Sequence, residues 1–345
     1  DMIPHAMQGC RRAGVKLVLT SSDSPETASS MGKKIGLSDK GMISGDTIAE
    51  SSLTSEKPNY TDAEIFCRVS AAQRITIIDE LRAAGETVAV VGYSDNDYEM
   101  VTHADLGITS LENTTGCVYE ASGLIVRDDN FASVVEMIKE ARQLHRNIKR
   151  CIFALLSSLV MFSLTAIADM ATGSNAVTPM LAALLTAVVI PLCCTGFRNV
   201  TADIKSDMTA SGFISRGKGD RMFFVRSLAC GTICGVISAI FVIIMSGLLP
   251  TAQVSSALLT LLTVMTGTMA VESVDKRPGS FRNKTIPKYL LNVVIATSLT
   301  AILLPYIPFV NLLFGFAMPH PLASITAVIA GVVPAIAIEI KKHLN

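Results

Sequence analysis

Six long apolar stretches in the second part of the chain constrain its fold more than any other feature. A helix needs roughly 20 apolar residues to cross about 30 Å of hydrocarbon, so each stretch is long enough to span a membrane. Their interiors hold almost no formal charge, and Arg226, Glu272 and Glu339 lie near the ends of their stretches. The pattern predicts a multi-pass integral membrane protein with six transmembrane helices, at about 151–169, 177–197, 223–248, 252–272, 289–308 and 319–340.

Basic residues between the stretches predict the orientation in the membrane. The loops after the first, third and fifth stretches, near 168–178, 247–254 and 305–321, contain no Lys or Arg, whereas the C-terminal tail carries Lys341 and Lys342. Lys and Arg are enriched in cytoplasmic loops, so both termini are expected to be cytoplasmic. A buried soluble core would show no such alternation. The loops after the second and fourth stretches hold the basic clusters Arg198, Lys205, Arg216, Lys218 and Arg221, then Lys276, Arg277, Arg282, Lys284 and Lys288.

The amino-acid composition limits the classes of molecule that this protein can be expected to bind. Half of the residues are apolar and the formal net charge is zero. No basic stripe stands out beyond the cytoplasmic loops, so we expect no nucleic-acid partner. Residues 1–12 are polar and do not resemble a signal peptide, so insertion is expected to depend on the spans themselves. Membrane lipid is therefore the first predicted partner.

Residues 1–130 alternate between strand and helix patterns. Pro25 and Ser70 each mark the start of a helix, and Gly85 marks the end of the second. This order predicts an α/β unit with a mostly parallel sheet and its ligand site at the carboxyl ends of the strands. The strands are expected at Val15–Thr20, Glu64–Val69, Thr87–Gly92, Leu106–Ile108 and Leu124–Val126.

From residue 131 the pattern becomes helical and continues into the first apolar stretch. The segment from Phe131 to Asp169 contains neither Pro nor Gly, so nothing in it should break a helix. We therefore expect three parts: a soluble domain at 1–130, a stalk helix at 131–150 and a six-helix transmembrane domain at 151–345.

Several short motifs carry a resemblance to a known family. Six short runs of this sequence resemble motifs of P-type ATPases and occur in the same order as in that family. The family motifs are TGD-x-P-x-TA, FARVSPxQK, GDGxND, ADxGI, DDNF and NIKK. The corresponding runs here are Ser21–Ala28, Phe66–Arg74, Gly92–Asp97, Ala104–Ile108, Asp128–Phe131 and Asn147–Arg150.

The resemblance implies a specific fold and a missing part. It predicts that residues 1–130 form part of a Rossmann-type phosphorylation domain of the haloacid-dehalogenase-like (HAD-like) class. The family's phosphorylated Asp lies in a DKTGT motif, and this chain contains no DKTG. The chain is thus expected to correspond to the C-terminal half of a pump, without a nucleotide domain. A separate N-terminal half or another membrane protein is the expected protein partner.

The resemblance also implies site residues, several of them altered. Ser21 and Asp23 correspond to the TGD motif, whose hydroxyl holds the transferred phosphoryl group, and Arg74 corresponds to the family lysine that balances phosphate charge. Asn96 and Asp97 match the end of GDGxND.

A change at one motif position bears on metal binding. The first Asp of GDGxND, a Mg²⁺ ligand in the family, corresponds to Tyr93, a phenol that cannot replace a carboxylate. Asp95 and Asp97 remain as carboxylates for a weakened Mg²⁺ site.

The resemblance also implies which membrane positions should be polar. Cation pumps of the family carry polar residues in their fifth and sixth membrane helices, and the corresponding positions here are Leu159, Phe162, Leu184 and Val188. Intramembrane carboxylates are costly and are kept where ions are coordinated, so their absence argues against transport of a hard divalent cation. A residual transport path could use Ser157, Ser158, Thr186 and Pro191.

Two cysteines raise a separate metal hypothesis. Cys230 and Cys234 stand four apart on one helix face and could bind a soft metal. Buried cysteines without metal are far commoner, and neither His nor a carboxylate accompanies this pair.

Three functional classes stay open. The first is a degenerate pump-like protein, non-catalytic alone, that acts as a pseudoenzyme, subunit or regulator; Tyr93 and the apolar helices favour it. The second is half of an active ATP-driven cation or lipid transporter, favoured by the continuous stalk and the sheet pattern. The third is a membrane protein that handles a soft metal or lipid. A neighbouring reading frame with DKTGT would favour the second class.

Overall fold

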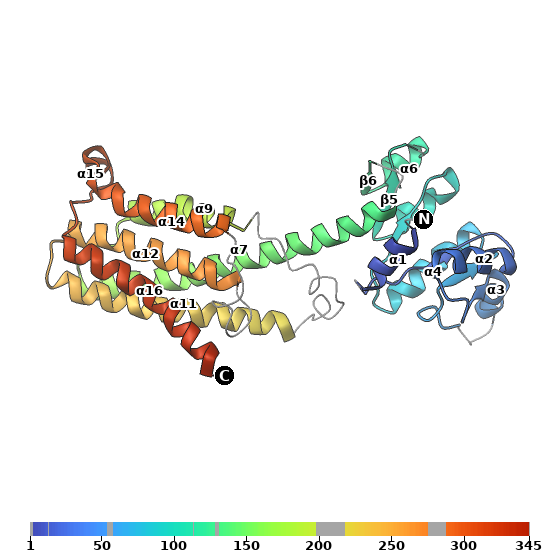
Figure 1. Ribbon diagram of the computed structural model, residues 1–345, viewed down its shortest axis with the longest axis horizontal. Coiled ribbons are helices and arrows are strands. Elements are labelled where there is room, and N and C mark those ends of the chain that lie inside the picture. Colours follow the sequence, from blue (N-terminus) through green and yellow to red (C-terminus); the bar gives the residue numbers. More distant parts are fainter. Residues whose placement is uncertain are drawn as a thin grey trace. The chain divides into compact units, whose positions relative to one another are not determined.

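The computed structural model describes residues 3–12, 14–53, 58–112, 114–127, 131–197, 218–274 and 288–344. The chain divides between Arg142 and Gln143 into two compact units. We call them the α/β unit and the helical unit (Figure 1). Asp128, Asp129, Asn130 and most of the basic loop residues after the second and fourth apolar stretches lie outside the described residues, so those expectations stay predictions.

The α/β unit alternates short strands with helices, as expected. Its helix α7 continues into the helical unit, so the predicted unbroken helix through Asp169 is confirmed. The elements are α1 (Ile3–Arg12), β1 (Leu19–Thr20), α2 (Pro25–Ile35), β2 (Ile43–Ser44), α3 (Gly45–Leu53), β3 (Ile65–Cys67), α4 (Ala71–Ala83), β4 (Ala89–Val91), a 3₁₀ turn η1 (Asp95–Asp97), α5 (Tyr98–His103), β5 (Leu106–Ser110), α6 (Gly116–Ala121), β6 (Leu124–Val126) and α7 (Phe131–Thr172).

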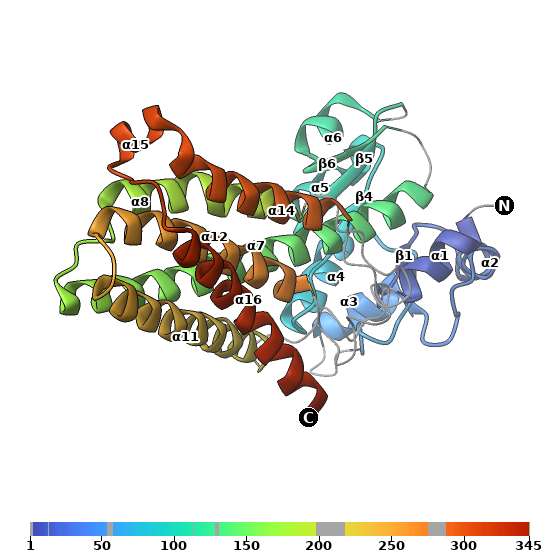
Figure 2. The ribbon, with the colours of Figure 1, turned by 60° about the vertical axis from the view of Figure 1, so that its left-hand side comes forward.

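Two three-stranded sheets take the place of the one sheet that we expected. Their strand orders are β1-β3-β2 and β4-β5-β6, and every pair is parallel. Among the described strands, β1 has a neighbour only in β3, and β4 has one only in β5. No described strand pairs with both of these edges, so the two sheets are separate. Figure 2 shows β4, β5 and β6 of the second sheet side by side.

Local capping explains where the two predicted helices begin. The Ser24 hydroxyl accepts from the backbone N–H of Thr27, with Pro25 in the first turn of α2. At α4, Ser70 and Gln73 form a reciprocal capping box. Both predicted helix starts are confirmed.

Helix α4 packs against both sheets. Ile77 belongs to the apolar cluster around Phe66, whereas its neighbour Ile78 belongs to the cluster around Val90. A charged contact reinforces this link, because Arg82 Nη2 donates to Asp105 Oδ1 over 2.9 Å.

The other oxygen of this carboxylate anchors the start of the second sheet. The backbone N–H of Val88 donates to Asp105 Oδ2 over 2.8 Å. These donors, Arg82 first, lower the pKa of Asp105 below its ordinary value. The second sheet is thereby tied to α4 by packing and by charge.

The helical unit contains four helices that are long and apolar enough to cross a membrane: Ala132–Thr172, Phe223–Ser246, Thr251–Val274 and Lys288–Tyr306. Two further apolar helices, Pro179–Thr195 and Pro321–Pro334, are shorter. The protein is therefore a multi-pass membrane protein, and the count of six spans stays a prediction. The elements after α7 are α8 (Pro179–Leu184), a π-helical turn η2 (Leu185–Val189), α9 (Ile190–Thr195), α11 (Lys218–Ser246), α12 (Thr251–Val274), α14 (Lys288–Leu303), η4 (Leu304–Tyr306), α15 (Pro308–Phe314) and α16 (Pro321–Leu344).

Helix α12 is the centre of the helical unit. It packs against α11, α14 and α16 and is buried along most of its length. Glycines allow the close approaches: a Cβ at Gly267 would lie 2.5 Å from Val294, and one at Gly331 would lie 2.7 Å from Val264. Small residues play this part in membrane helices because association there depends on close packing.

The contact between α7 and α11 yields a test. A Cβ added at Gly231 would lie 2.7 Å from the backbone oxygen of Ser157, which cannot swing away as a side chain could. We expect Gly231→Val to push the two helices apart and to cost about 1–3 kcal/mol of stability. Thermal unfolding of the full chain in detergent, followed by circular dichroism, should show a lower midpoint. Gly247→Ala is the matched control, because its nearest neighbour would lie at an ordinary 3.7 Å. Equal midpoints for the two variants would contradict this packing.

Candidate functional site

The residues predicted after β1 form a tight turn at the carboxyl end of the strand. Ser21 Oγ donates to Asp23 Oδ2 over 2.7 Å, and the Asp23 backbone N–H donates back to Ser21 Oγ over 3.1 Å. The turn is fixed to the first sheet, because the Ser21 N–H donates to Phe66 O and the Arg68 N–H donates to Asp23 O. The strand thus presents a hydroxyl and a carboxylate together at its end.

The same turn recurs after β2, where the sequence analysis predicted nothing. Ser44 Oγ donates to Asp46 Oδ2 over 3.3 Å, and the Asp46 N–H donates to Ser44 Oγ over 3.2 Å. Arg68 follows the strand between the two turns, has a left-handed φ of 53°, and its guanidinium lies 3.7 Å from Asp46. The repeated Ser-x-Asp spacing was the available signal, and it was missed because β2 has only two residues.

Asp97 is the centre of the loop that follows β4. Its Oδ2 accepts from the Tyr93 N–H at 3.2 Å, the Ser94 N–H at 3.2 Å and the Ser94 hydroxyl at 3.0 Å. Gly92 permits this closeness, because a Cβ there would lie 2.9 Å from the Asp97 Cβ. The loop therefore folds around its own carboxylate.

Arg74 occupies the other oxygen of the same carboxylate. Its Nη1 lies 3.3 Å from Asp97 Oδ1, and both side chains are largely shielded, with 16% and 23% of their surface exposed. The buried Nε of Arg74 has no hydrogen-bond partner in the described part of the chain. The structure thus joins two of the predicted site residues directly, across α4 and η1.

Asp95 and Asn96 take no part in this contact among the described residues. Asp95 Oδ1 accepts from the thiol of Cys117 at 2.8 Å. Hydrogen bonds from Cys117 first, and then from Thr115, lower the pKa of Asp95. Asn96 is exposed, as is the ring of Tyr93. The two carboxylates of η1 are therefore directed to different partners.

The predicted catalytic residues form two separate sets. Ser21 and Asp23 follow the first sheet, whereas Asp97 and its contacts follow the second. Within the described ranges, no hydrogen bond or ion pair joins Ser21 or Asp23 to Arg74 or Asp97.

The residues of the Asp97 loop do not fit a Mg²⁺ site as they stand. A carboxylate pair or several anionic oxygens would be needed for this hard cation. Tyr93 supplies no charge, Asp95 points to Cys117, and Asp97 already accepts four contacts, one from a cation. The positive charge of Arg74 beside Asp97 also disfavours a cation at this carboxylate.

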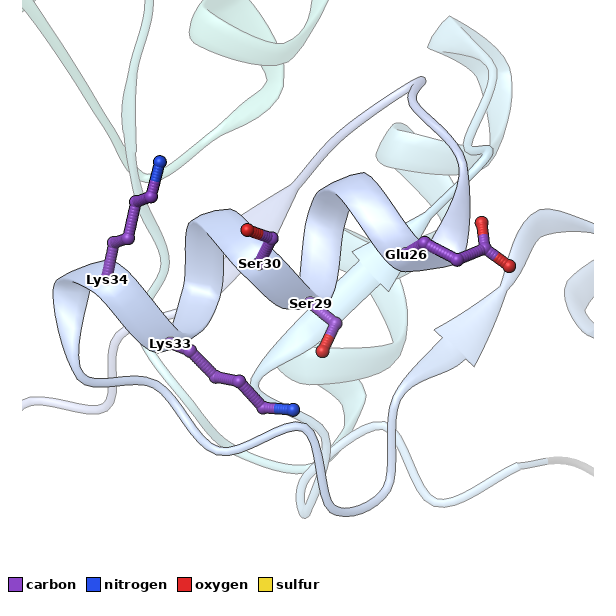
Figure 3. A pocket seen from close by; sticks show the side chains of 5 residues that line it. All are labelled: Glu26, Ser29, Ser30, Lys33 and Lys34. Carbon is purple, nitrogen blue, oxygen red and sulfur yellow. The ribbon is translucent and has the colours of Figure 1, made fainter.

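A shallow hollow lies on α2 (Figure 3). Its lining residues already serve the fold: Lys33 Nζ lies 2.6 Å from Asp39, and Ser29 Oγ donates to the same carboxylate. Lys33 lowers the pKa of Asp39 by its hydrogen bond and charge. The hollow is lined by Glu26, Ser29, Ser30, Lys33 and Lys34, and two of these side chains, those of Ser29 and Lys33, are thus already engaged within the fold.

The predicted transport residues differ in burial, so the structure does not bring all four of them together in the interior of the helical unit. Ser157 and Ser158 are buried: Ser157 Oγ donates to Ser227 O over 3.0 Å, and Ser158 Oγ has no partner within the described part. Thr186 and Pro191 are exposed, and Thr186 donates to its own helix at Ala182 O.

The segment around Pro191 has its own backbone geometry. The π-helical turn Leu185–Val189 directly precedes the helix that contains this proline. This location is expected because proline lacks an N–H and its ring crowds the preceding turn.

Two buried acidic residues of the helical unit stand out in the structure. Asp169 ends the apolar part of α7 and accepts from the N–H groups of Ala176 at 2.9 Å and Val177 at 3.0 Å, as well as from the Ser174 hydroxyl. Glu272 pairs with Arg226 at 2.5 Å. Each carboxylate has donors within the protein, which is how a buried charge is tolerated.

The cysteine pair of α11 has no further metal ligand nearby. Cys230 and Cys234 are both buried in the apolar core of the helical unit. In the part of the chain that the structure describes, no group of three or more His, Cys, Asp or Glu side chains comes together. The soft-metal hypothesis therefore stays a prediction.

Comparison with known proteins gives partial matches to cation pumps, while no protein-family model matches the chain. The calcium-transporting ATPase of Bacillus subtilis is 33% identical over 160 residues, 46% of this chain and 18% of the relative. Calcium-transporting ATPase 1 of Bacillus cereus is 30% identical over 164 residues, 45% of this chain and 18% of the relative. Human sodium/potassium-transporting ATPase subunit alpha-2 is 29% identical over 185 residues, with the same coverage of 45% and 18%.

These matches cover about half of this chain and less than a fifth of the relatives' own length. The relatives are P-type ATPases, and the similarity supports that superfamily for this chain. Together with the long apolar helices, it characterises the chain as a P-type ATPase-like membrane protein.

Proposed function

We propose that this chain corresponds to the C-terminal half of a P-type cation pump and is non-catalytic by itself, acting as a pseudoenzyme, pump subunit or regulator. In this proposal the α/β unit is part of a HAD-like phosphorylation domain and the helical unit is a six-helix transmembrane bundle. Partial similarity to cation pumps, parallel strands with polar residues at their carboxyl ends, and four long plus two shorter apolar helices support it.

The observation that carries the proposal is that both carboxylate oxygens of Asp97 already have partners within the protein. Its two oxygens accept contacts from Tyr93, Ser94 and Arg74. A carboxylate that must coordinate a metal or balance a phosphoryl group needs free acceptor positions. Because Asp97 bonds to its own loop and to a cation, the loop is suited to a structural role, and Mg²⁺ would be at most a weak ligand here.

The helical unit supports the same conclusion for transport. Two of its acidic residues, Asp169 and Glu272, are buried, and both have donors inside the protein. Positions 159 and 188, where the pump resemblance calls for polar groups, hold Leu159 and Val188, which are 64% and 46% exposed. Such apolar exposed side chains suit contact with lipid rather than with a dehydrated cation.

One observation favours the alternative, half of an active ATP-driven cation or lipid transporter. The strands β1 and β4 are both sheet edges among the described strands, and each leads to one of the two polar sets. Edge strands offer unpaired backbone groups to another chain. A separate N-terminal half that paired there could supply the phosphorylated Asp.

Charge distribution within the helical unit supports cytoplasmic termini. Contacts between Phe153 and Phe223, and between Gly196 and Leu290, place the starts of α11 and α14 at the end where α7 enters. Under the positive-inside rule this basic end faces the cytoplasm. The described Lys and Arg side chains at this end are Arg146, Lys149, Arg150, Arg221, Arg226 and Lys288.

Phosphorylation from ATP tests the proposal. We expect the purified full chain, incubated with Mg²⁺ and γ-labelled ATP, to form no acid-stable, hydroxylamine-sensitive acyl phosphate, because it lacks the attacking carboxylate. The calcium-transporting ATPase of Bacillus subtilis, handled in parallel, serves as the positive control. Labelling of this chain alone would overturn the proposal. Labelling of a separate DKTGT-containing polypeptide only when this chain is added would favour the active-half alternative.

The affinity for Mg²⁺ tests the proposal that Tyr93 weakens metal binding at this loop. We expect Tyr93→Asp to strengthen Mg²⁺ binding roughly tenfold, a gain of about 1.4 kcal/mol, because it places a second carboxylate beside Asp97. Isothermal titration calorimetry of the full chain would measure it. Tyr93→Phe, which adds no charge, should leave the affinity unchanged. Equal affinities for the Asp and Phe variants would mean that position 93 does not face the metal.

A further inference from the structure

The short helix α15 carries apolar side chains on two opposite sides. Val310 and Phe314, which are four residues apart, pack against the apolar core of the helical unit. Phe309 and Leu312 lie on the other side of the helix, with 72% and 87% of their surface exposed. A helix that is apolar all round requires an apolar environment on every side, and the described residues supply one only toward the core.

The polar side chain of α15 faces the protein. Asn311 is the one polar residue of this helix, and its Oδ1 is buried without a hydrogen-bond partner among the described residues. It lies three residues before Phe314 and therefore on the same side of the helix. Water would favour the reverse arrangement, with the amide outward and Phe309 and Leu312 inward. Hydrocarbon favours the observed one, because an outward amide there would lose its hydrogen bonds to water.

The surroundings of α15 are uncharged and apolar. The helix lies at the end of the helical unit away from the starts of α11 and α14 (Figures 1 and 2). No Asp, Glu, Lys or Arg occurs between residues 289 and 338. Exposed apolar side chains continue onto the neighbouring helices, with Leu303 at the end of α14 and Leu322 at the start of α16. Between them Tyr306 is exposed, a residue type that is enriched at membrane–water interfaces.

Contacts on the protein side fix the direction in which α15 faces. Gly315 ends the helix with a left-handed φ of 67°, and the ring of Phe314 stacks on Phe316 with a centroid distance of 5.8 Å. Phe316 is buried in the core, and the following carbonyl, that of Ala317, accepts from Ser256 Oγ over 2.7 Å. The outward side of α15 is therefore set by packing on α12 and the core.

We propose that α15 lies in the membrane interface at this end of the helical unit, with Phe309 and Leu312 inserted about 5–10 Å into the boundary between headgroups and acyl chains. Lipid suits the uncharged surroundings and the continuous exposed apolar surface. A stable protein–protein interface needs roughly 800 Å² from each partner, far more than two side chains of a short helix provide. The inference does not depend on the proposed catalytic status of the chain.

Fluorescence of an introduced tryptophan provides the test. The chain contains no Trp, so the indole of Phe309→Trp would be the sole one. The full chain is reconstituted in phosphatidylcholine vesicles that contain lipids brominated either close to the headgroup or close to the methyl end of the acyl chain. Iodide, present on both sides of the bilayer, serves as the aqueous quencher. We expect brominated lipid to quench most of the emission, more strongly with bromine close to the headgroup, and iodide to quench little.

Further variants calibrate the result. Leu312→Trp should behave like Phe309→Trp, because the two side chains lie one turn apart on the same side, and the pair guards against a folding effect at either position. Tyr98→Trp, at an exposed position of the α/β unit, should be quenched by iodide and not by brominated lipid. Strong iodide quenching of both α15 variants would show that this side faces water. Weak quenching by iodide and lipid alike would show that protein, such as a second copy of the chain, covers it, and either result would overturn the inference.

Discussion

The carboxylate of Asp97 organises the part of the α/β unit where chemistry was expected. One oxygen holds the loop after β4 closed through Tyr93 and Ser94, and the other contacts Arg74 on α4. Since α4 packs on the cores of both sheets, this contact links the second sheet to the helix that also covers the first. The contacts place Asp97 in a structural network rather than in an open coordination site.

In the helical unit, too, buried acidic side chains bind partners within the protein. Buried polar groups there are costly unless they find partners, and the partners in this chain are internal. Asp169 binds the turn between α7 and α8, and Glu272 binds Arg226. Hydroxyls on α12 donate mostly to their own helix, as Thr263 does to Leu259 and Thr266 does to Leu262. The described interior is thus closely packed and its two buried carboxylates have internal donors, while the side-chain oxygens of Ser158, Ser227 and Asn311 have no partner in the described residues.

The sequence predicted the features that depend on neighbouring residues. Pro25 and Ser70 mark the starts of α2 and α4, and the absence of Pro and Gly from Phe131 to Asp169 leaves α7 unbroken there. Features that depend on distant segments were missed. The contact of Arg74 with Asp97 joins residues 23 positions apart, and the turn at Ser44 has meaning only once β2 pairs with β3. Thr186 and Ser157 looked alike in sequence, yet packing put one outside and the other inside.

A double-mutant cycle on Arg74 and Asp97 tests the central claim most directly. Arg74→Gln, Asp97→Asn and the double variant would be compared by hydrogen exchange of α4 and β4 in the full chain. A structural pair predicts a favourable coupling of about 1–3 kcal/mol, because this is a shielded charge-assisted contact, and the coupling should not change in about 10 mM Mg²⁺. Coupling near zero, or protection of the wild-type Asp97 loop by Mg²⁺, would contradict the account and point to a working metal site.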